Sequence, residues 1–371
     1  MSPRFAQAHS EAADWQDAVA ECAQTLRGFS GNLGFLYASD LFAPSLPAIL
    51  AALRSATGIR DWSGTVGLGV CATGREYLDR PALVVLAADL PHGSYALLPV
   101  IRQEEDLRGY ADRFEIAGQP AAFGVVHGDP RNALMGELLD LVAQRTLTGF
   151  LTGGLSSSRS QTSQISGDVC EGGLSGVLFS QEIGVITGLT QGVSPLAGKH
   201  LITDCQDNIL IALDHRPALD VFEEVIGEVL ARDLRRAAGE IFVGLPVAGS
   251  DTADYKVRPV VAIDPKNRLL AIGESVRPGD TLLFGRRDSR AAVTDMRHML
   301  EGLKSRLARP PKGGLYFSCL GRGESLFGPD SAELRMISAA LGDFPLAGFY
   351  ANGEISHNRL YGYTGVLTLF I

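Results

Sequence analysis

The feature that most constrains this fold is a plan of secondary structure that three separate parts of the sequence share. Each part has the pattern of strand, helix, strand and strand, and its strands end in polar loops that contain glycine. The last part covers residues 314–371, and the two earlier parts lie within residues 33–88 and 122–180. Because glycine and polar side chains at strand ends are a common way to build a pocket, these loops are the first place to look for function.

The pattern predicts an α/β (α+β) chain in which mixed β-sheets are flanked by helices, and it does not fit a doubly wound dinucleotide fold. We interpret the three parts as repeated strand–helix–strand–strand units, with chance similarity among glycine-rich strand ends as the alternative. In the first unit we expect a helix at 46–57 and strands at 33–37, 65–70 and 82–88. An amphipathic helix is expected before it, at 10–27.

The length of 371 residues allows a large core and more than one domain. We expect an N-terminal helical segment in residues 1–30, followed by two regions, 31–238 and 239–371. The proposed boundary follows a long charged helix that is expected at 217–232.

Charge and hydropathy exclude several classes of protein. The net charge is −9 and no basic run occurs, so a nucleic-acid-binding surface is not expected. No apolar stretch approaches the ~18 residues of a membrane span, and the N-terminus has no signal-peptide core. The five cysteines are scattered without a CxxC pair, which indicates reduced thiols and a cytoplasmic protein.

Several short motifs, each weak alone, occur in an order and spacing that is fairly specific. The N-terminal ones are Cys71-Ala-Thr-Gly74, Gly153-Gly154 and Thr190-Gln-Gly-Val-Ser-Pro195. The C-terminal ones are Tyr255-Lys-Val-Arg258, Ser318-Cys319-x-x-Arg322 with the later Glu333, and Gly348-Phe-Tyr350-x-Asn352-Gly353-Glu354-Ile355. In these motifs the chain resembles FIST proteins over nearly its whole length after the first 30 residues.

The resemblance implies a FIST N-terminal and a FIST C-terminal region that together form a small-ligand-binding sensory module, with amino acids among the ligands proposed for the family. It also brings an alternative, because some FIST proteins look like haem-binding sensors of nitric oxide. The sequence has no kinase, cyclase, chemotaxis or F-box segment. We therefore expect it to signal through a separate protein partner.

The residues themselves suggest a site for a ligand that carries both charges. Arg258 and Arg322 could hold a carboxylate, and Glu354 could hold an ammonium group. The alternatives are structural ion pairs of the arginines with glutamates such as Glu324 or Glu333, and a Glu354 that caps a turn. The candidate ligand-binding residues are Arg258, Ser318, Cys319, Arg322, Tyr350, Asn352, Gly353, Glu354, Gly153 and Gly154.

Three further hypotheses rest on single features. Cys319 is a weak candidate for a catalytic nucleophile with His357 as its base, although a buried cysteine is commonly structural. His127 and His357 are weak candidates for haem ligands, and no residue set has the spacing of a metal site. The Ser-rich segment 153–167 could be a mobile lid or an ordinary connection.

Overall fold

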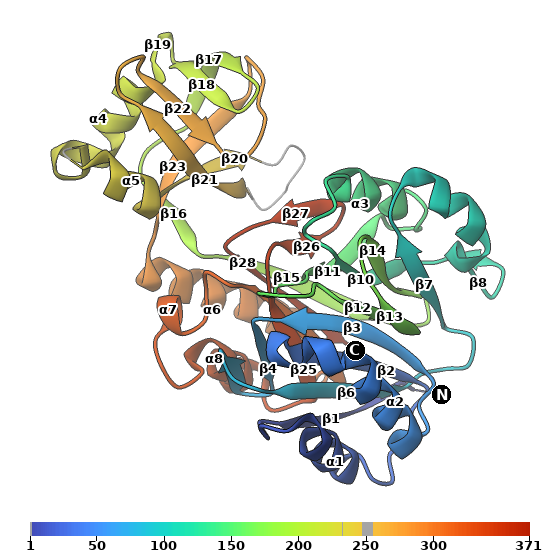
Figure 1. Cartoon of the computed structure of the whole chain (residues 1–371). Coiled ribbons are helices and arrows are strands. Elements are labelled where there is room, and N and C mark those ends of the chain that lie inside the picture. The colour runs from blue at the N-terminus through green and yellow to red at the C-terminus, as the bar shows by residue number, and fades with distance from the viewer. Residues whose placement is uncertain (1, 232, 247–254) are drawn as a thin grey trace. The chain divides into compact units, whose positions relative to one another are not determined.

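The computed structural model describes residues 2–231, 233–246 and 255–371, and the chain forms two compact units. Unit 1 contains Met1–Thr190 and Met296–Ile371, and unit 2 contains Gln191–Asp295. In sequence, unit 2 is therefore an insertion into unit 1 (Figure 1).

Unit 1 contains three six-stranded sheets, each built on two parallel strands that a helical segment connects. Sheet I has the order β1 (Arg4–Ser10), β6 (Leu83–Asp89), β2 (Leu33–Ser39), β3 (Asp61–Gly67), β12 (Gln164–Ser166) and β13 (Asp168–Cys170). Its helices are α1 (Trp15–Thr25), η1 (Asp40–Ser45) and α2 (Leu46–Thr57). Asp14 caps α1 by accepting hydrogen bonds from the amides of Gln16 and Asp17, and Gly58 ends α2 in the left-handed conformation.

Sheet II has the order β7 (Tyr95–Ile101), β14 (Leu174–Phe179), β10 (Phe123–Gly128), β11 (Phe150–Leu155), β26 (Glu354–Ser356) and β27 (Arg359–Tyr361). Its helical segments are η2 (Glu104–Phe114) and α3 (Met135–Ala143), and a short ribbon pairs β8 (Glu115–Ile116) with β9 (Gln119–Pro120).

Sheet III has the order β15 (Val185–Gln191), β28 (Thr364–Phe370), β24 (Gly313–Cys319), β25 (Leu346–Ala351), β4 (Gly69–Ala72) and β5 (Arg75–Leu78). Its helices are α6 (Ser289–Arg306), α7 (Glu324–Phe327) and α8 (Ala332–Leu341).

The three sheets exchange strands in a cycle. Along the chain, β12 lies between β11 and β14 of sheet II but pairs with β3 of sheet I. In the same way, β26 lies between β25 and β28 of sheet III but pairs with β11 of sheet II. β4 belongs in sequence to sheet I but pairs with β25 of sheet III. Each sheet therefore needs a strand from elsewhere in the chain to be complete.

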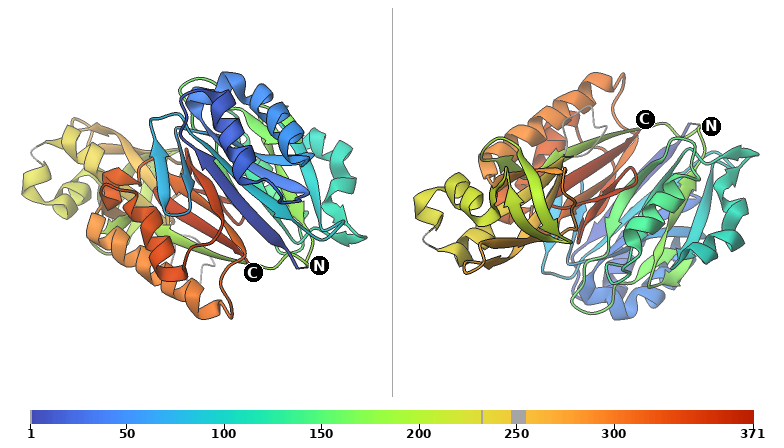
Figure 2. Two further views of the ribbon diagram at one scale, coloured as in Figure 1. Left: turned by 90° about the horizontal axis from the view of Figure 1, so that it is seen from below. Right: turned by 90° about the horizontal axis from the view of Figure 1, so that it is seen from above.

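The inner faces of the three sheets share one core, and the helices cover the outer faces (Figure 2). At the centre of this core, Tyr37, His127 and Phe317 occupy matching positions in β2, β10 and β24, with ring centroids 5.6–6.3 Å apart. Each sheet also has one apolar cluster between its outer face and its own helices, which makes three further clusters.

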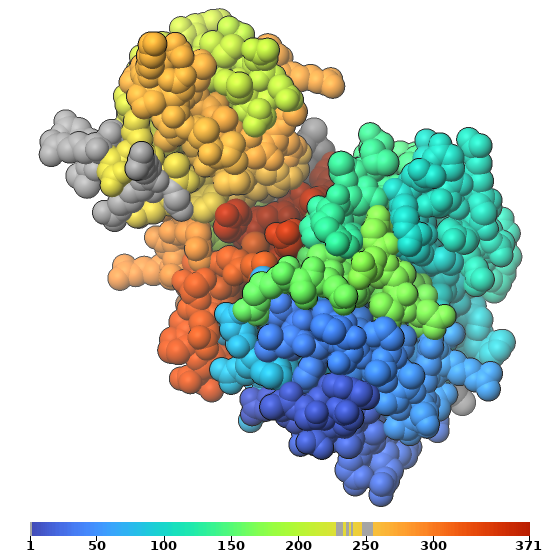
Figure 3. Space-filling model, viewed as in Figure 1, coloured from blue at the N-terminus to red at the C-terminus, as the bar shows by residue number. Residues whose placement is uncertain are grey.

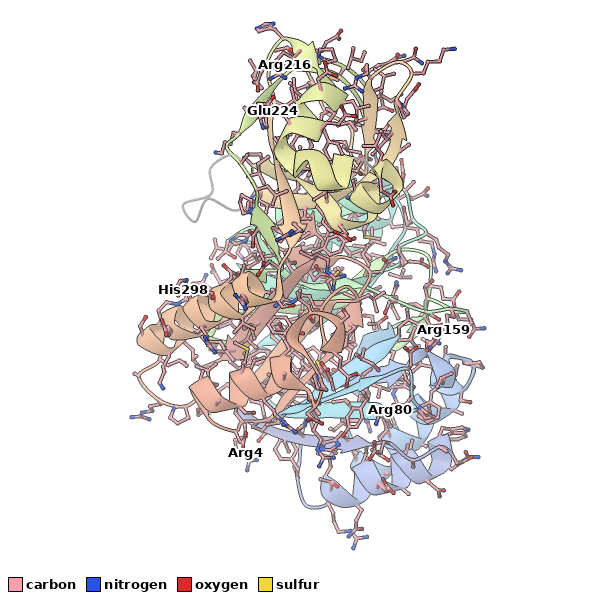
Figure 4. All side chains as sticks on the ribbon, turned by 90° about the vertical axis from the view of Figure 1, so that its left-hand side faces the viewer. Arg4, Arg80, Arg159, Arg216, Glu224 and His298 are labelled. Atoms are coloured by element: carbon pink, nitrogen blue, oxygen red, sulfur yellow. The ribbon has the colours of Figure 1, made fainter. Side chains whose placement is uncertain are left out.

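Unit 2 is a closed sheet with its own apolar core. Its ring runs β20–β21–β22–β18–β17–β23 and closes by pairing of β23 with β20. The strands are β16 (Val193–Pro195), β17 (His200–Gln206), β18 (Ile209–Leu213), β19 (Arg216–Pro217), β20 (Ile241–Pro246), β21 (Tyr255–Asp264), β22 (Leu269–Ile272) and β23 (Thr281–Arg287), and the helices are α4 (Ala218–Ala231) and α5 (Leu234–Glu240). Arg216 and Glu224 form an ion pair of 2.8 Å on its surface (Figure 4).

The predicted fold class is confirmed: mixed sheets are flanked by helices. The expected strand at 65–70 was wrong, because the chain turns at Leu68 and its halves join different sheets as β3 and β4. The strand β1 lies within the expected N-terminal helical segment. The division at 238/239 and the interpretation as repeated units stay predictions. Within the described residues, no helix is long and apolar enough to cross a membrane.

Candidate functional site

The outer face of sheet III differs in chemistry from the outer faces of the other two sheets. The sheets can be compared through one glycine in each parallel pair: Gly64 faces Leu36, Gly153 faces Val126, and Gly348 faces Tyr316. Two residues further along the strands, Ser318 matches Ala38 and Gly128, and Tyr350 matches Val66 and Leu155. At the positions of Tyr316, Ser318 and Tyr350, sheet III therefore has side chains with a hydroxyl group where sheets I and II have apolar residues or glycine.

These polar groups converge on Glu333, a fully buried residue in the first turn of α8. Its carboxylate accepts hydrogen bonds from the Tyr316 hydroxyl at 2.7 Å and the Ser318 hydroxyl at 3.1 Å. It also accepts from Arg322 Nε at 2.7 Å and from the amide of Gly323 at 3.1 Å. With four donors around it, the carboxylate is well suited to hold the charge of Arg322 in the interior.

Arg322 is buried, with its guanidinium 4.8 Å from the centre of the Phe327 ring and Nη1 3.4 Å from the Thr190 carbonyl oxygen. Burial acts to lower the pKa of Arg322, but the interactions with Glu333 and Tyr316 together outweigh burial and raise that pKa. The third nitrogen, Nη2, has no hydrogen-bond partner within the described residues. One of the two sequence interpretations, a structural ion pair with Glu333, is therefore present, and one donor remains for another group.

Glu354 begins β26 and is fully buried. Its Oε2 accepts hydrogen bonds from the Thr364 amide at 3.1 Å and the Thr364 hydroxyl at 2.8 Å, whereas Oε1 has no partner in the described part of the chain. Burial raises the pKa of Glu354 to about 8, although hydrogen bonds with Thr364, the charge of Arg322 and a weaker interaction with the Cys319 thiol oppose the shift. At neutral pH this side chain is mostly a neutral acid.

Cys319 ends β24 in the same area and is partly buried. Burial and the neighbouring Glu354 raise the pKa of its thiol to about 12, so the thiolate that a nucleophile needs is disfavoured. The ring of His357 packs edge-on against the ring of Phe150, with centroids 4.9 Å apart, and its Nδ1 lies 3.3 Å from the Ser356 hydroxyl. These contacts give no support to a Cys319–His357 pair.

We call Tyr316, Ser318, Cys319, Arg322, Glu333 and Glu354 the C-terminal polar cluster.

Glu76 lies on β5 beside this cluster and was not among the residues predicted from the sequence. The Tyr350 hydroxyl donates a hydrogen bond to Glu76 Oε2, and Oε1 has no partner among the described residues. Burial raises the pKa of Glu76 to about 7, and the charge of Glu333 adds to the shift. The motif that ends at Gly74 lies two residues before it, but only the strand exchange of β4 and β5 brings Glu76 to Tyr350.

Strand pairing joins two of the predicted loops. Gly154 pairs with Glu354 and Gly153 with Ile355, because β11 extends to Leu155 and so contains both glycines. The Gly353 carbonyl accepts a hydrogen bond from the Leu155 amide at 2.9 Å, and Asn352 is exposed.

The segment after β11 does not have the character of a lid. Ser156, Ser157, Ser163 and Gln164 are buried, and the segment continues into strand β12. In Figure 3 it forms a continuous green band between the blue and teal parts of unit 1. Arg159 lies on the surface (Figure 4), where it binds the buried carboxylate of Asp40 at 2.9 Å.

The other predicted arginine, Arg258, belongs to unit 2. It lies on β21, and its Nε is 2.6 Å from Glu274 Oε2. Unit 1 therefore builds the C-terminal polar cluster without Arg258.

His127, the first histidine candidate for haem, is fully buried in the central core. Its Nε2 lies 3.1 Å from the Tyr37 hydroxyl and its Nδ1 lies 3.4 Å from the Ser63 hydroxyl. Burial lowers the pKa of His127 to about 3, so the ring is neutral. Both nitrogens are engaged, which favours a structural role. Across the described ranges, no group of three or more His, Cys, Asp or Glu side chains could hold a metal ion.

Comparison with known protein families identifies two domains in this chain. The FIST N domain matches residues 32–216 and the FIST C domain matches residues 218–357. The chain belongs to the FIST family. FIST domains are small-ligand-binding sensory modules, and that general role extends to this member.

Relatives of this FIST protein include the uncharacterized protein Rv0628c of Mycobacterium tuberculosis, which is 29% identical over 96% of this chain and 95% of its own length. The uncharacterized protein Mb0898c of Mycobacterium bovis is 28% identical over 96% of this chain and 94% of its own. Among solved structures, a cyanuric acid hydrolase from A. caulinodans aligns with 100% of this chain and 99% of its own, with a TM-score of 0.32 and 10% identity. At this score the similarity carries no weight for fold or function.

Proposed function

We propose that this FIST protein is a cytoplasmic sensor that binds an amino-acid-like metabolite at the C-terminal polar cluster and signals through a separate protein. One observation carries the proposal: two buried ionisable groups, the cationic Arg322 and the acid Glu354, each have one polar atom that no nitrogen or oxygen of the described residues meets in a hydrogen bond. An unpaired buried polar atom costs roughly 1–3 kcal/mol. A ligand that supplies the missing partners recovers that cost when it binds.

An α-amino acid has complementary chemistry. Its carboxylate would accept a hydrogen bond from Arg322 Nη2, and its ammonium group would donate to Glu354 Oε1. The positive charge of Arg322 already lowers the pKa of Glu354, although burial raises that pKa by more. Binding of an ammonium group favours the ionised carboxylate, so Glu354 would release its proton as the ligand enters.

The burial of both residues links binding to a change of conformation. A ligand reaches them only if neighbouring parts of the chain move. We expect segment 320–331 to move, because its Phe327 ring lies over the Arg322 guanidinium and it contains Gly323 and Gly328 with positive φ angles of 59° and 94°. A ligand that binds the moved state shifts the population toward it. The altered surface is what a separate signalling partner would recognise. Five free cysteines are compatible with a cytoplasmic setting.

The proposal is tested by isothermal titration with the common amino acids and their α-keto and α-hydroxy analogues. Glu354→Gln keeps the shape but cannot ionise, and Arg322→Lys keeps the charge but loses the planar fork. Each change should weaken binding by about tenfold or more. Glu324→Gln removes an exposed carboxylate from the same covering segment and serves as the matched control. Equal affinity in Glu354→Gln and the wild type, or no binding of any compound, would refute the proposed site.

A further inference from the structure

Unit 1 also contains a surface cavity of about 440 Å³ that shares no residue with the C-terminal polar cluster. It lies where β15 of sheet III meets the amino-terminal ends of β10 and β11 of sheet II. Phe123, Phe150, Ile183 and Val185 supply apolar walls, and Arg306 lies at the rim. Thr148, Gln181 and Thr187 add polar groups, so the cavity offers apolar walls together with hydrogen-bonding partners, as a small-molecule site requires.

The edge strands of the three sheets place three residues at matching positions around the unit. Phe5 on β1 faces Ala88, and Tyr95 on β7 faces Phe179. For β15, the Ile371 amide donates to the Gly184 carbonyl just as the Ser180 amide donates to the Ser94 carbonyl. The residue that follows Gly184 therefore matches the residue that follows Ser94: Val185 corresponds to Tyr95 and to Phe5.

In two of the three boundaries between sheets, an aromatic ring of the chain fills this position. Phe5 stacks on Phe370 of sheet III with ring centroids 4.7 Å apart, and its ring lies against Gly313. Tyr95 reaches into sheet I, where its hydroxyl lies 2.9 Å from Asp61 Oδ2 and 2.8 Å from the Asn32 carbonyl oxygen, so it can donate to either acceptor.

At the third boundary the matching residue is Val185, whose side chain is short. Phe123, which matches Gly313 in register, stacks on Phe179 with ring centroids 4.9 Å apart, and the cavity lies beside Phe123 and Val185.

We propose that the cavity binds a small aromatic carboxylic acid, whose ring packs beside Val185, where the other two boundaries have the larger side chains of Phe5 and Tyr95. The ring contacts Phe123 and Phe150, which favour aromatic partners. The carboxylate faces Arg306, whose Nη2 is already oriented by a 2.6 Å hydrogen bond to the Thr187 carbonyl.

The test uses phenylacetate as the probe and neutral phenylacetamide as its matched analogue, with binding measured by titration calorimetry on the full chain. Val185→Phe places a ring in the cavity, as in the other two boundaries. It should lower the affinity for both probes by at least about tenfold without lowering the melting temperature. Arg306→Gln, at an exposed position, should lower the affinity for phenylacetate by about tenfold and leave phenylacetamide unchanged.

Arg322→Lys is the control that separates this site from the proposed amino-acid site, and it should leave phenylacetate binding unchanged. The inference is overturned if the wild type binds neither probe at millimolar concentration. It is also overturned if Val185→Phe binds phenylacetate as the wild type does, or if Arg306→Gln affects both probes alike. Should Val185→Phe fail to fold, the contrast between the two probes in Arg306→Gln still decides the question.

Discussion

At the scale of single residues, the C-terminal polar cluster makes the stability of the protein depend on pH through Glu354. Its pKa is raised by burial to about 8, so between the pH at which an unfolded glutamate ionises and about pH 8 the folded state binds more protons. The free energy of unfolding therefore falls as pH rises through this window, by up to about 1.4 kcal/mol per pH unit from this residue.

We expect Glu354→Gln to reduce that slope, because glutamine keeps the shape and cannot ionise. Urea unfolding at several pH values between 5 and 8.5 measures the slope, and Glu324→Gln is the control for loss of a carboxylate from the surface. Glu76, with its pKa raised by burial to about 7, should leave a residual slope in the Glu354→Gln variant. An unchanged slope in Glu354→Gln would show that its carboxyl is not the buried acid described here.

At the scale of elements, three glycines permit the close approach of the parallel strands. A Cβ atom built on Gly64, Gly153 or Gly348 would lie 1.9, 1.8 or 1.7 Å from the carbonyl oxygen of the residue that it faces. Gly348→Ala should therefore force β24 and β25 apart and destabilise the protein by roughly 3 kcal/mol or more.

Gly302→Ala is the matched control, because Gly302 lies inside α6 with no atom within 4 Å of the added methyl group. That change should be neutral or stabilising by about 0.5–1 kcal/mol, since alanine is the better helix former. Thermal and urea unfolding of the two variants test the comparison. Similar stabilities for both would mean that the strands separate at little cost.

The elements also show which parts of the fold the sequence encodes locally. The helix expected at 46–57 is α2, and the strand expected at 82–88 is β6 within one residue, because both have clear hydrophobic periodicity. At Leu68 the chain turns between Gly67 and Gly69. Because the residues on both sides are apolar, the sequence there reads as one strand and the turn was not predicted. The exchange of β4, β12 and β26 depends on pairing between distant segments, which no local pattern reports.

The candidate site was likewise predicted only where local sequence motifs report it, and not where distant segments come together. Ser318, Arg322 and Glu354 were predicted from strand-end motifs, and the ion pair of Arg322 with Glu333 was one of two interpretations. Arg258 came from the same type of motif but lies in unit 2, because the chain leaves unit 1 and returns to it. Glu76 was missed, since its contact with Tyr350 joins residues 274 positions apart.

At the scale of the whole molecule, the boundaries of the family domains and the compact units differ. The FIST C domain begins at residue 218, inside unit 2, whereas the core clusters of unit 1 draw on residues from both ends of the chain. The core of unit 2 is formed by its own residues alone. The Gln191 amide donates to Asp295 Oδ2 at 2.7 Å, so the two ends of unit 2 meet. These are the properties of an inserted domain.

We therefore expect unit 2 to be removable as a piece. Replacing residues 191–295 with a short Gly/Ser linker should leave unit 1 folded, because the core clusters of unit 1 contain no residue of this range and a short linker spans the gap. The deletion removes only Gln191 from β15 and residues 289–295 from the start of α6. A cut at 238/239 should instead leave two fragments that do not fold alone, since the first lacks most of sheet III and β26 of sheet II. Near-ultraviolet circular dichroism and cooperative urea unfolding distinguish the two outcomes. If fragment 1–238 unfolds cooperatively by itself while the linker variant does not, the exchanged strands do not determine the folding unit.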